Sequence, residues 1–270
     1  MLLMTTQDIA RPDTLPESLG FRSGKKGVHN SRTLSFNDLS TLLAHVPVGA
    51  SNEDYRDAIR EDNVLDKGTG STRRYVGQRL SQLYGLDTEI FIFRVFRLLW
   101  ERAGEGKPLL AMLLALARDP LLRITARPVL SLEIGAAFEK QAIQQELRAQ
   151  TGDRFNETSI TKISQMAGSS WTQSGHLSGR YKKVRERPIC TPVTTAYALF
   201  LASAEGLGGK RLFHTFWTTV LDIPTDECKA QAREASRQNL ITYRQAGGVI
   251  AVDFSPILTA EETEILREQD

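Results

Sequence analysis

Apolar residues recur at intervals of three or four along most of the chain, and short polar or Gly/Pro-containing segments separate the apolar stretches. This spacing is typical of amphipathic α-helices with one buried face. Helices are expected at 35–46, 51–62, 71–84, 90–100, 108–117, 134–149, 156–173, 193–205, 212–221 and 225–238. The pattern therefore predicts a mainly α-helical protein.

The spacing changes near the C-terminus. The runs 240–244 and 249–254 are rich in β-branched and aromatic residues, and a glycine-containing segment joins them, which predicts a β-hairpin. Helices followed by such a hairpin are typical of a winged-helix unit, in which Arg244 and Gln245 near the tip could touch nucleic acid. Alternatively, the hairpin only closes the core.

The composition suggests three parts. Residues 1–33 combine Gly and Pro with basic residues and cannot bury enough surface to fold alone, which predicts an N-terminal arm. This arm either packs on the body or lies along DNA. Residues 34–130 are expected to form a helical domain with a first helix-turn-helix. Residues 131–270 are expected to form a second domain with another helix-turn-helix, a basic loop and the terminal hairpin.

Two helices are too apolar to be exposed. The helix at 90–100 carries four aromatic residues at helical spacing, which favours core packing over a stacking site. The run at 108–117 is about half the length needed to span a bilayer, and Arg118 and Asp119 end it. Both are therefore expected to be core helices, and no membrane span is expected.

The helix at 156–173 has the clearest division of faces. Its apolar stripe consists of Ile160, Ile163, Ala167 and Trp171. The opposite face holds Gln, Ser and Thr with one Lys, where an ordinary exposed face would be rich in Glu and Lys. Such side chains suit donor and acceptor contacts in a major groove. We expect this helix to be a recognition helix that uses Lys162, Gln165, Ser169 and Gln173.

A basic segment follows this helix. Between Trp171 and Arg187 the chain has five basic residues and one acid, a local charge of +4 in a protein of net charge +2. Clustered cations release counterions from a phosphate backbone. The expected phosphate-anchoring residues are Arg180, Lys182, Lys183, Arg185 and Arg187, on a wing or loop. The alternative is a solvated surface loop.

A second candidate contact lies earlier in the chain. A break at 66–70 precedes a helix that Ser71 is placed to cap, so the outline is that of a helix-turn-helix. Arg73, Arg74 and Gln78 are its expected DNA contacts. An ordinary pair of antiparallel helices with exposed arginines would share this outline.

Motifs of enzymes are lacking in the sequence. It has no GxxxxGK phosphate loop, no GxGxxG after a strand and no GxSxG. Glu227 and Lys229 only weakly resemble a nuclease motif. The two cysteines form no CxxC, and the four histidines are scattered. We therefore expect a non-catalytic cytoplasmic protein without metal or cofactor, and a monomer by default.

Several blocks of the sequence resemble the BrxA family of bacterial BREX phage-exclusion systems. They are DNVL at 62–65, STRR at 71–74, LARDPLL at 116–122, SWTQSGHLSG at 170–179, TFW at 215–217 and REAS at 233–236. The resemblance covers roughly residues 35 to 260, and the block at 170–179 is distinctive.

The resemblance implies a compact helical protein with helix-turn-helix elements that binds double-stranded DNA within a defence system. It also implies partners among other BREX proteins and brings no catalytic residues. The alternative is a scaffold subunit, in which the polar helix face and the basic segment dock another protein without reading DNA.

Overall fold

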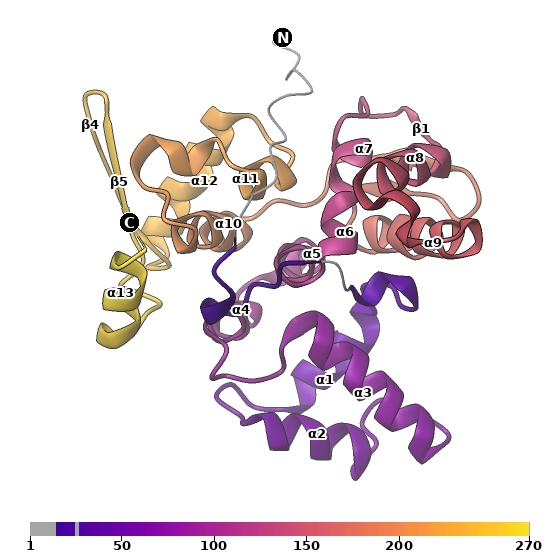
Figure 1. Cartoon of the computed structure of the whole chain (residues 1–270). Coiled ribbons are helices and arrows are strands. Elements are labelled where there is room, and N and C mark those ends of the chain that lie inside the picture. Colours follow the sequence, from indigo (N-terminus) through magenta and orange to yellow (C-terminus); the bar gives the residue numbers. More distant parts are fainter. Residues whose placement is uncertain (1–14, 25–26, 270) are drawn as a thin grey trace.

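The computed structural model describes residues 15–24 and 27–269, and over these residues the chain is mainly α-helical, as predicted. Helix α5 (Lys107–Arg118) lies at the centre, with other helices around it (Figure 1). Every residue from Leu109 to Ala117 is at most 1% exposed. A helix that is apolar on all sides must be covered on all sides. The prediction of a buried core helix here is confirmed.

The elements before α5 occupy the lower part of the view in Figure 1. They are η1 (Glu17–Leu19), η2 (Val28–Asn30), α1 (Phe36–His45), α2 (Asn52–Arg60), α3 (Gly70–Tyr84), α4 (Phe91–Trp100) and η3 (Gly104–Gly106). Ser51 and Asp54 form the capping box of α2. Helix α3 is capped by Thr69, whose hydroxyl accepts the N–H of Thr72, so the expected cap at Ser71 is wrong.

The aromatic residues of α4 are core residues, as expected. Phe91, Phe93, Phe96 and Trp100 are all buried, and the ring centroids of Phe96 and Trp100 lie 5.3 Å apart. Tilted aromatic pairs at this separation contribute packing energy beyond the area they bury.

A helix-and-strand unit follows α5 and lies on the right of Figure 1. Its elements are α6 (Pro120–Ile124), α7 (Ala126–Leu130), β1 (Ala137–Phe138), α8 (Lys140–Thr151), η4 (Gly152–Arg154), α9 (Glu157–Gln173), β2 (Leu177–Ser178) and β3 (Lys183–Arg185). The strands are antiparallel in the order β1-β3-β2. The helix expected from residue 134 begins only at Lys140, because Ala137 and Phe138 pair with β3 instead.

The remaining elements form the left of Figure 1. They are α10 (Pro192–Ala204), η5 (Gly209–Phe213), α11 (Phe216–Val220), α12 (Thr225–Arg237), β4 (Thr242–Ala246), β5 (Val249–Asp253) and α13 (Ala260–Arg267). The predicted terminal hairpin is confirmed, and Gly247 and Gly248 form its turn. The prediction of a single helix at 212–221 is wrong. The structure has the short helix η5 up to Phe213, and a capping box at Thr215 starts the separate helix α11. Helix α13 was not expected.

The described part of the predicted arm packs on the body. Leu19, Phe21 and Val28 are buried, and they belong to the same hydrophobic cluster as Leu114 of α5. Residues 1–14 and 25–26 of the arm lie outside the described residues. The division of the rest of the chain at residue 130 stays a prediction.

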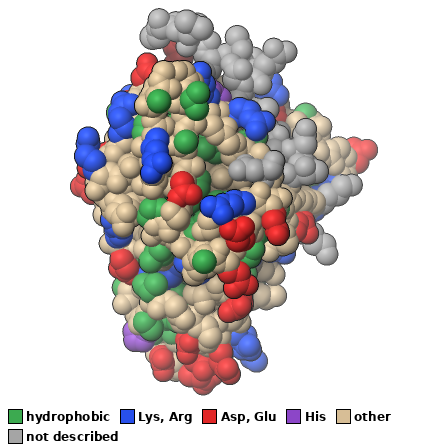
Figure 2. Space-filling model, turned by 90° about the vertical axis from the view of Figure 1, so that its left-hand side faces the viewer, with side chains coloured by type: hydrophobic (Ala, Val, Ile, Leu, Met, Phe, Trp, Pro, Cys, Tyr) green, Lys and Arg blue, Asp and Glu red, His purple; other side chains and the backbone are tan. Residues whose placement is uncertain are grey.

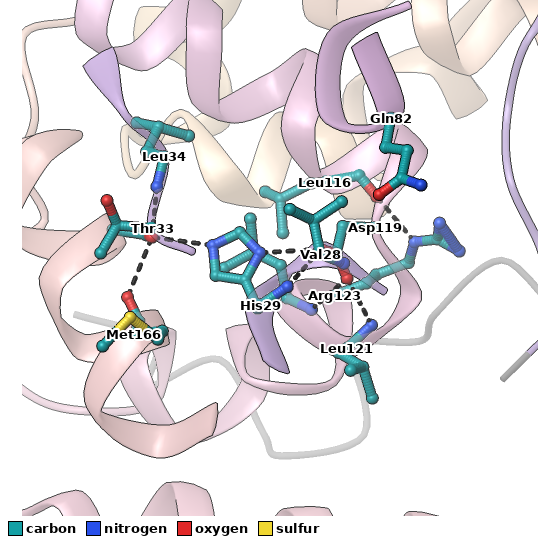
Figure 3. Close-up of polar contacts among 12 residues, drawn as sticks. Val28, His29, Thr33, Leu34, Gln82, Leu116, Asp119, Leu121, Arg123 and Met166 are labelled. Carbon is teal, nitrogen blue, oxygen red and sulfur yellow. Dashed lines mark hydrogen bonds and ion pairs between the residues drawn. The ribbon is translucent and has the colours of Figure 1, made fainter. Parts of the chain in front are cut away.

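Asp119, between α5 and α6, joins the arm to the body (Figure 3). Its Oδ2 accepts the N–H groups of Val28 (2.6 Å) and His29 (3.0 Å) and contacts Nδ1 of His29 at 2.8 Å. Its Oδ1 accepts the N–H groups of Leu121 and Leu122 and so caps α6. One carboxylate therefore ties the arm to the start of a helix.

The same junction continues to α9. The hydroxyl of Ser170 lies 2.8 Å from Nε2 of His29, accepts the N–H of Leu34 and donates to the carbonyl of Met166. The order Ser–His–Asp is that of a catalytic triad. However, all three side chains are 0% exposed, and the hydroxyl proton is already donated inside the helix. This network therefore joins three segments of the fold.

The charge state of Asp119 follows from these contacts. Burial alone raises the pKa of this carboxyl, but the neighbouring His29 and the N–H donors outweigh burial, and the pKa falls below 3.8. The resulting stabilisation is present above the unfolded value of 3.8 and is lost as the pH falls through the lower folded value.

Substitution Asp119→Asn is expected to lower the free energy of unfolding at neutral pH by about 3–5 kcal/mol, because it leaves buried donors and His29 without their anion. Urea unfolding followed by circular dichroism measures this change. Asp226→Asn is the control, since that side chain is 96% exposed, and its effect should stay within about 0.5 kcal/mol. Equal effects of the two substitutions would contradict the assigned role.

Glu205 ends α10 and holds α11. Its Oε1 accepts the indole N–H of Trp217 at 2.7 Å. Burial raises the pKa of Glu205 to about 7, against the opposing effects of this hydrogen bond and of Arg123. The folded state therefore keeps the proton when the unfolded chain has lost it. Stability falls as the pH rises from 4.5 to about 7.

Glu205→Gln is therefore expected to gain stability relative to the wild type as the pH rises, by about 2–3 kcal/mol between about pH 5 and about pH 8. Unfolding curves of both proteins at the two pH values give this double difference. The exposed Glu264→Gln serves as the control and should follow the wild type. A Glu205→Gln protein that tracks the wild type at both pH values would show that the proton is not held there.

Candidate nucleic-acid interface

Helix α9 is held by its two ends and its apolar stripe. Asn156 caps it by accepting the N–H of Ser159 at 2.9 Å, as predicted. The stripe Ile160, Ile163, Ala167 and Trp171 is buried. Over its first three turns α9 therefore has the expected buried apolar face, and its opposite, polar face is exposed to solvent.

The solvent side of α9 carries three of the expected contacts. Lys162 and Gln165 are exposed, and Ser169 is half-buried. With Thr158, which is also exposed, they are spaced at intervals of three or four residues and so lie on one face of the helix. None of these four side chains forms a hydrogen bond or an ion pair with another described residue.

Gln173 does not belong to this face, which corrects the expectation. Its Oε1 accepts the N–H of Phe36 at 3.0 Å, and its Nε2 donates to the hydroxyl of Thr33 at 3.1 Å. The end of α9 is covered by the chain that enters α1, so this amide is used in the fold and cannot face a ligand at the same time.

Strands β2 and β3 form a small hairpin whose tip is basic. At Gly179 φ is +90°, and a Cβ there would lie 2.2 Å from the carbonyl oxygen of Lys182, so the tip requires glycine. Arg180, Tyr181 and Lys182 at the tip are all exposed. The guanidinium of Arg180 lies 5.2 Å from the ring centroid of Tyr181.

Two of the five expected phosphate anchors are directed inward. Arg185 is 0% exposed and pairs with Asp222 at 2.8 Å, which fixes β3 to the chain after α11. Lys183 is half-buried and donates to the hydroxyl of Thr172 at 2.7 Å, and burial lowers its pKa. Arg185 is therefore corrected to a structural residue. Arg180, Lys182 and Arg187 remain as the exposed cations of this segment.

The distinctive segment 170–179 serves the interior of the fold. The indole N–H of Trp171 donates to Thr125 at 2.8 Å, and His176 lies between Ser174 and the carbonyl of Val220. Burial lowers the pKa of His176 to about 3, so the ring is neutral. The expectation that Trp171 is a core residue is confirmed.

The first predicted helix-turn-helix consists of α2 and α3, and two of its three expected DNA contacts are exposed. Arg74 and Gln78 are exposed and lie one turn apart on α3. Arg73 is half-buried and donates to the carbonyl of Arg60 at 2.7 Å, so it holds α3 against the end of α2. Element η2 packs against both α3 and α9, which makes it the link between the two units.

Tyr181 is a surface residue that the sequence analysis did not single out. It is 87% exposed, although aromatic rings are usually buried. Its place between Arg180 and Lys182, two residues after a glycine, was the available signal, because exposed aromatic and basic side chains together are typical of nucleic-acid surfaces.

Comparison with protein-family models and with curated proteins finds no match for this chain. Among residues 15–24 and 27–269, no three His, Cys, Asp or Glu side chains lie close enough together to hold a metal ion. Within the same part of the chain, none of the helices has the length and apolar character needed to cross a membrane.

The different roles of Gln165 and Gln173 can be measured. Gln173→Ala is expected to lower the free energy of unfolding by about 1–3 kcal/mol, because the N–H of Phe36 loses its acceptor. Gln165→Ala, on the exposed face, should change it by less than about 0.5 kcal/mol. Chemical denaturation of both variants compares them directly. Equal stability of the two variants would contradict the structural role of Gln173.

Proposed function

We propose that residues 120–187 form a winged-helix unit that binds double-stranded DNA. The observation that carries the proposal is the combination of an uncommitted polar face on α9 with a basic tip on the hairpin that follows it. The order helix, β1, α8, α9, β2, β3, with the sheet order β1-β3-β2, agrees with such a unit. In this proposal the wing is the tip at 179–182 and not the C-terminal hairpin.

The two parts have different tasks in the proposal. Helix α9 enters the major groove, where Lys162, Gln165 and Ser169 donate to or accept from base edges. The wing, through Arg180 and Lys182, reaches the flanking backbone, and Arg187 just after β3 joins them in neutralising phosphates. Because Arg185, Lys183 and His176 hold the wing and the end of α9 together, both reach the duplex in a fixed relative position.

Arg74 and Gln78 of α3 are a secondary contact in this proposal. They meet DNA only if the duplex extends beyond the winged-helix unit or a second duplex binds. Together with the resemblance to the BrxA family, DNA binding leads to the further proposal that the chain is a non-catalytic DNA-binding component of a BREX defence system, with other BREX proteins as partners.

The wing is tested with Arg180→Ala/Lys182→Ala/Arg187→Ala in the full chain. Fluorescence anisotropy of a labelled duplex at several salt concentrations measures affinity. The wild type is expected to lose affinity steeply with salt. The triple variant should bind more weakly and flatten the log–log slope by about 3, since each lost phosphate contact removes about 1.

The matched control is Arg233→Ala/Arg237→Ala/Arg267→Ala, which removes the same charge from exposed positions of α12 and α13. It should keep most of the wild-type slope. If both triple variants lose affinity equally, net charge and not the wing governs binding. If the wild type does not bind duplex even at low salt, the DNA proposal fails and the face of α9 is a docking surface of a scaffold subunit.

A further inference from the structure

A cleft of about 1020 Å³ is formed by residues between Glu17 and Arg118, a part of the chain that does not include the wing. Its walls come from residues 17–23, α2, α3, the start of α4 and the end of α5. This volume is that of a pocket for a small molecule. The described arm segment forms one wall, so the cleft exists only when the arm is packed in place.

Basic side chains dominate the cleft. Arg22, Arg56, Arg60 and Arg118 line it, against the carboxylates of Glu17 and Glu89. None of the four arginines forms a salt bridge within the described part of the chain. Arg56 and Arg60 lie one turn apart on α2 and therefore share a face. The cleft thus gathers guanidinium groups that have no counter-ion among residues 15–24 and 27–269.

Arg118 indicates which kind of ligand would bind in the cleft. It is only 8% exposed, its Nη1 donates to the carbonyl of Gly20, and its Nε is buried without an acceptor among the described residues. Burial and the nearby Arg22 lower its pKa to about 10. A buried cation without an anion is costly to the fold. An anion in the cleft would neutralise this guanidinium.

The shape and the surroundings favour a small anion over a nucleic-acid duplex. Reaching a nearly buried guanidinium requires a group that can enter the cleft, as a terminal phosphate can. On the outside, α2 and its end expose carboxylates, namely Glu53, Asp54, Asp57, Glu61 and Asp62. Figure 2 shows acidic side chains gathered at the lower end of the molecule, the end at which α2 lies in Figure 1. A duplex lying across the outer face of α2 would be repelled.

The rest of the lining suits the organic part of such a ligand. Ser81 of α3 offers a hydroxyl that no described residue occupies, and the half-buried Ile90 adds apolar surface. Guanidinium groups match the oxygens of a phosphate in two-point hydrogen bonds. We propose that this cleft binds the phosphate groups of a small phosphorylated molecule, such as a nucleoside diphosphate, with Arg118 and Arg56 as anion ligands.

The test is isothermal titration calorimetry of the full chain, in chloride buffer of low ionic strength, with inorganic phosphate, pyrophosphate and ADP as separate probes. Pyrophosphate and ADP are expected to bind at one site. If ADP binds more tightly than pyrophosphate, the nucleoside adds contacts; equal affinities mean that the phosphates alone are recognised. Both results support the proposal.

Two variants locate the site. Arg56→Ala, an exposed change that should not affect folding, is expected to weaken pyrophosphate and ADP binding about tenfold or more. Arg118→Gln should abolish it, with circular dichroism as the check on folding. Arg233→Ala is the matched control and should bind as the wild type does, since this exposed arginine lies on α12.

Three results would overturn the proposal. In the first, none of the three probes binds the folded wild-type chain at millimolar concentration. In the second, Arg56→Ala binds pyrophosphate as tightly as Arg233→Ala does. In the third, small probes do not bind but Arg56→Ala weakens duplex binding, which would make the cleft a DNA contact. Because the wing triple variant should still bind ADP, failure here is distinct from failure of the winged-helix proposal.

Discussion

Asp119 is a carboxylate that has no contact with solvent, and such a charge is stable only when donors surround it. Its donors come from two places, the arm around His29 and the first turn of α6, and His29 carries the connection on to Ser170 of α9. The approach is close, because a Cβ at Gly27 would lie 2.1 Å from Oδ1. The arm, α6 and α9 are therefore positioned together, and the unit 120–187 depends on this junction.

Two anchors within and beside residues 120–187, the proposed winged-helix unit, explain why few polar side chains there lack a partner among the described residues. Arg185 with Asp222, and His176 with the carbonyl of Val220, fix the hairpin and the end of α9 to the region of α11. A binding surface works best when its side chains are presented by a rigid frame. Much of the polar sequence after Gly168 builds that frame, and the proposed binding surface consists of the first turns of α9 and the hairpin tip.

The net charge of the protein is only +2, but basic side chains are concentrated at two sites, the hairpin tip and the cleft beside α2. The hairpin tip is exposed, which suits the proposed contact with the backbone of a duplex. The cleft beside α2 is concave, contains the nearly buried Arg118 and is bordered by carboxylates, which suits a small anion.

Much of the local structure followed from the sequence alone. The apolar period of α4, α5 and α9 and the cap at Asn156 predicted those helices and their buried faces, because helix periodicity and capping are short-range properties. The C-terminal hairpin was also predictable, since its β-prone runs flank a glycine turn. The exposure of Lys162 and Gln165 followed from the same helical wheel.

Only the tertiary structure decided which polar residues are available. On a helical wheel Gln173 faces solvent, but the chain entering α1 covers it; in a basic run Arg185 resembles its neighbours, but it points inward to Asp222. The strand at Ala137 forms because β3 pairs with it, and the cleft exists because residues 17–23 pack beside α2 and α3. Each of these depends on segments that are distant in the sequence, and no local pattern encodes which distant segment will cover a given side chain.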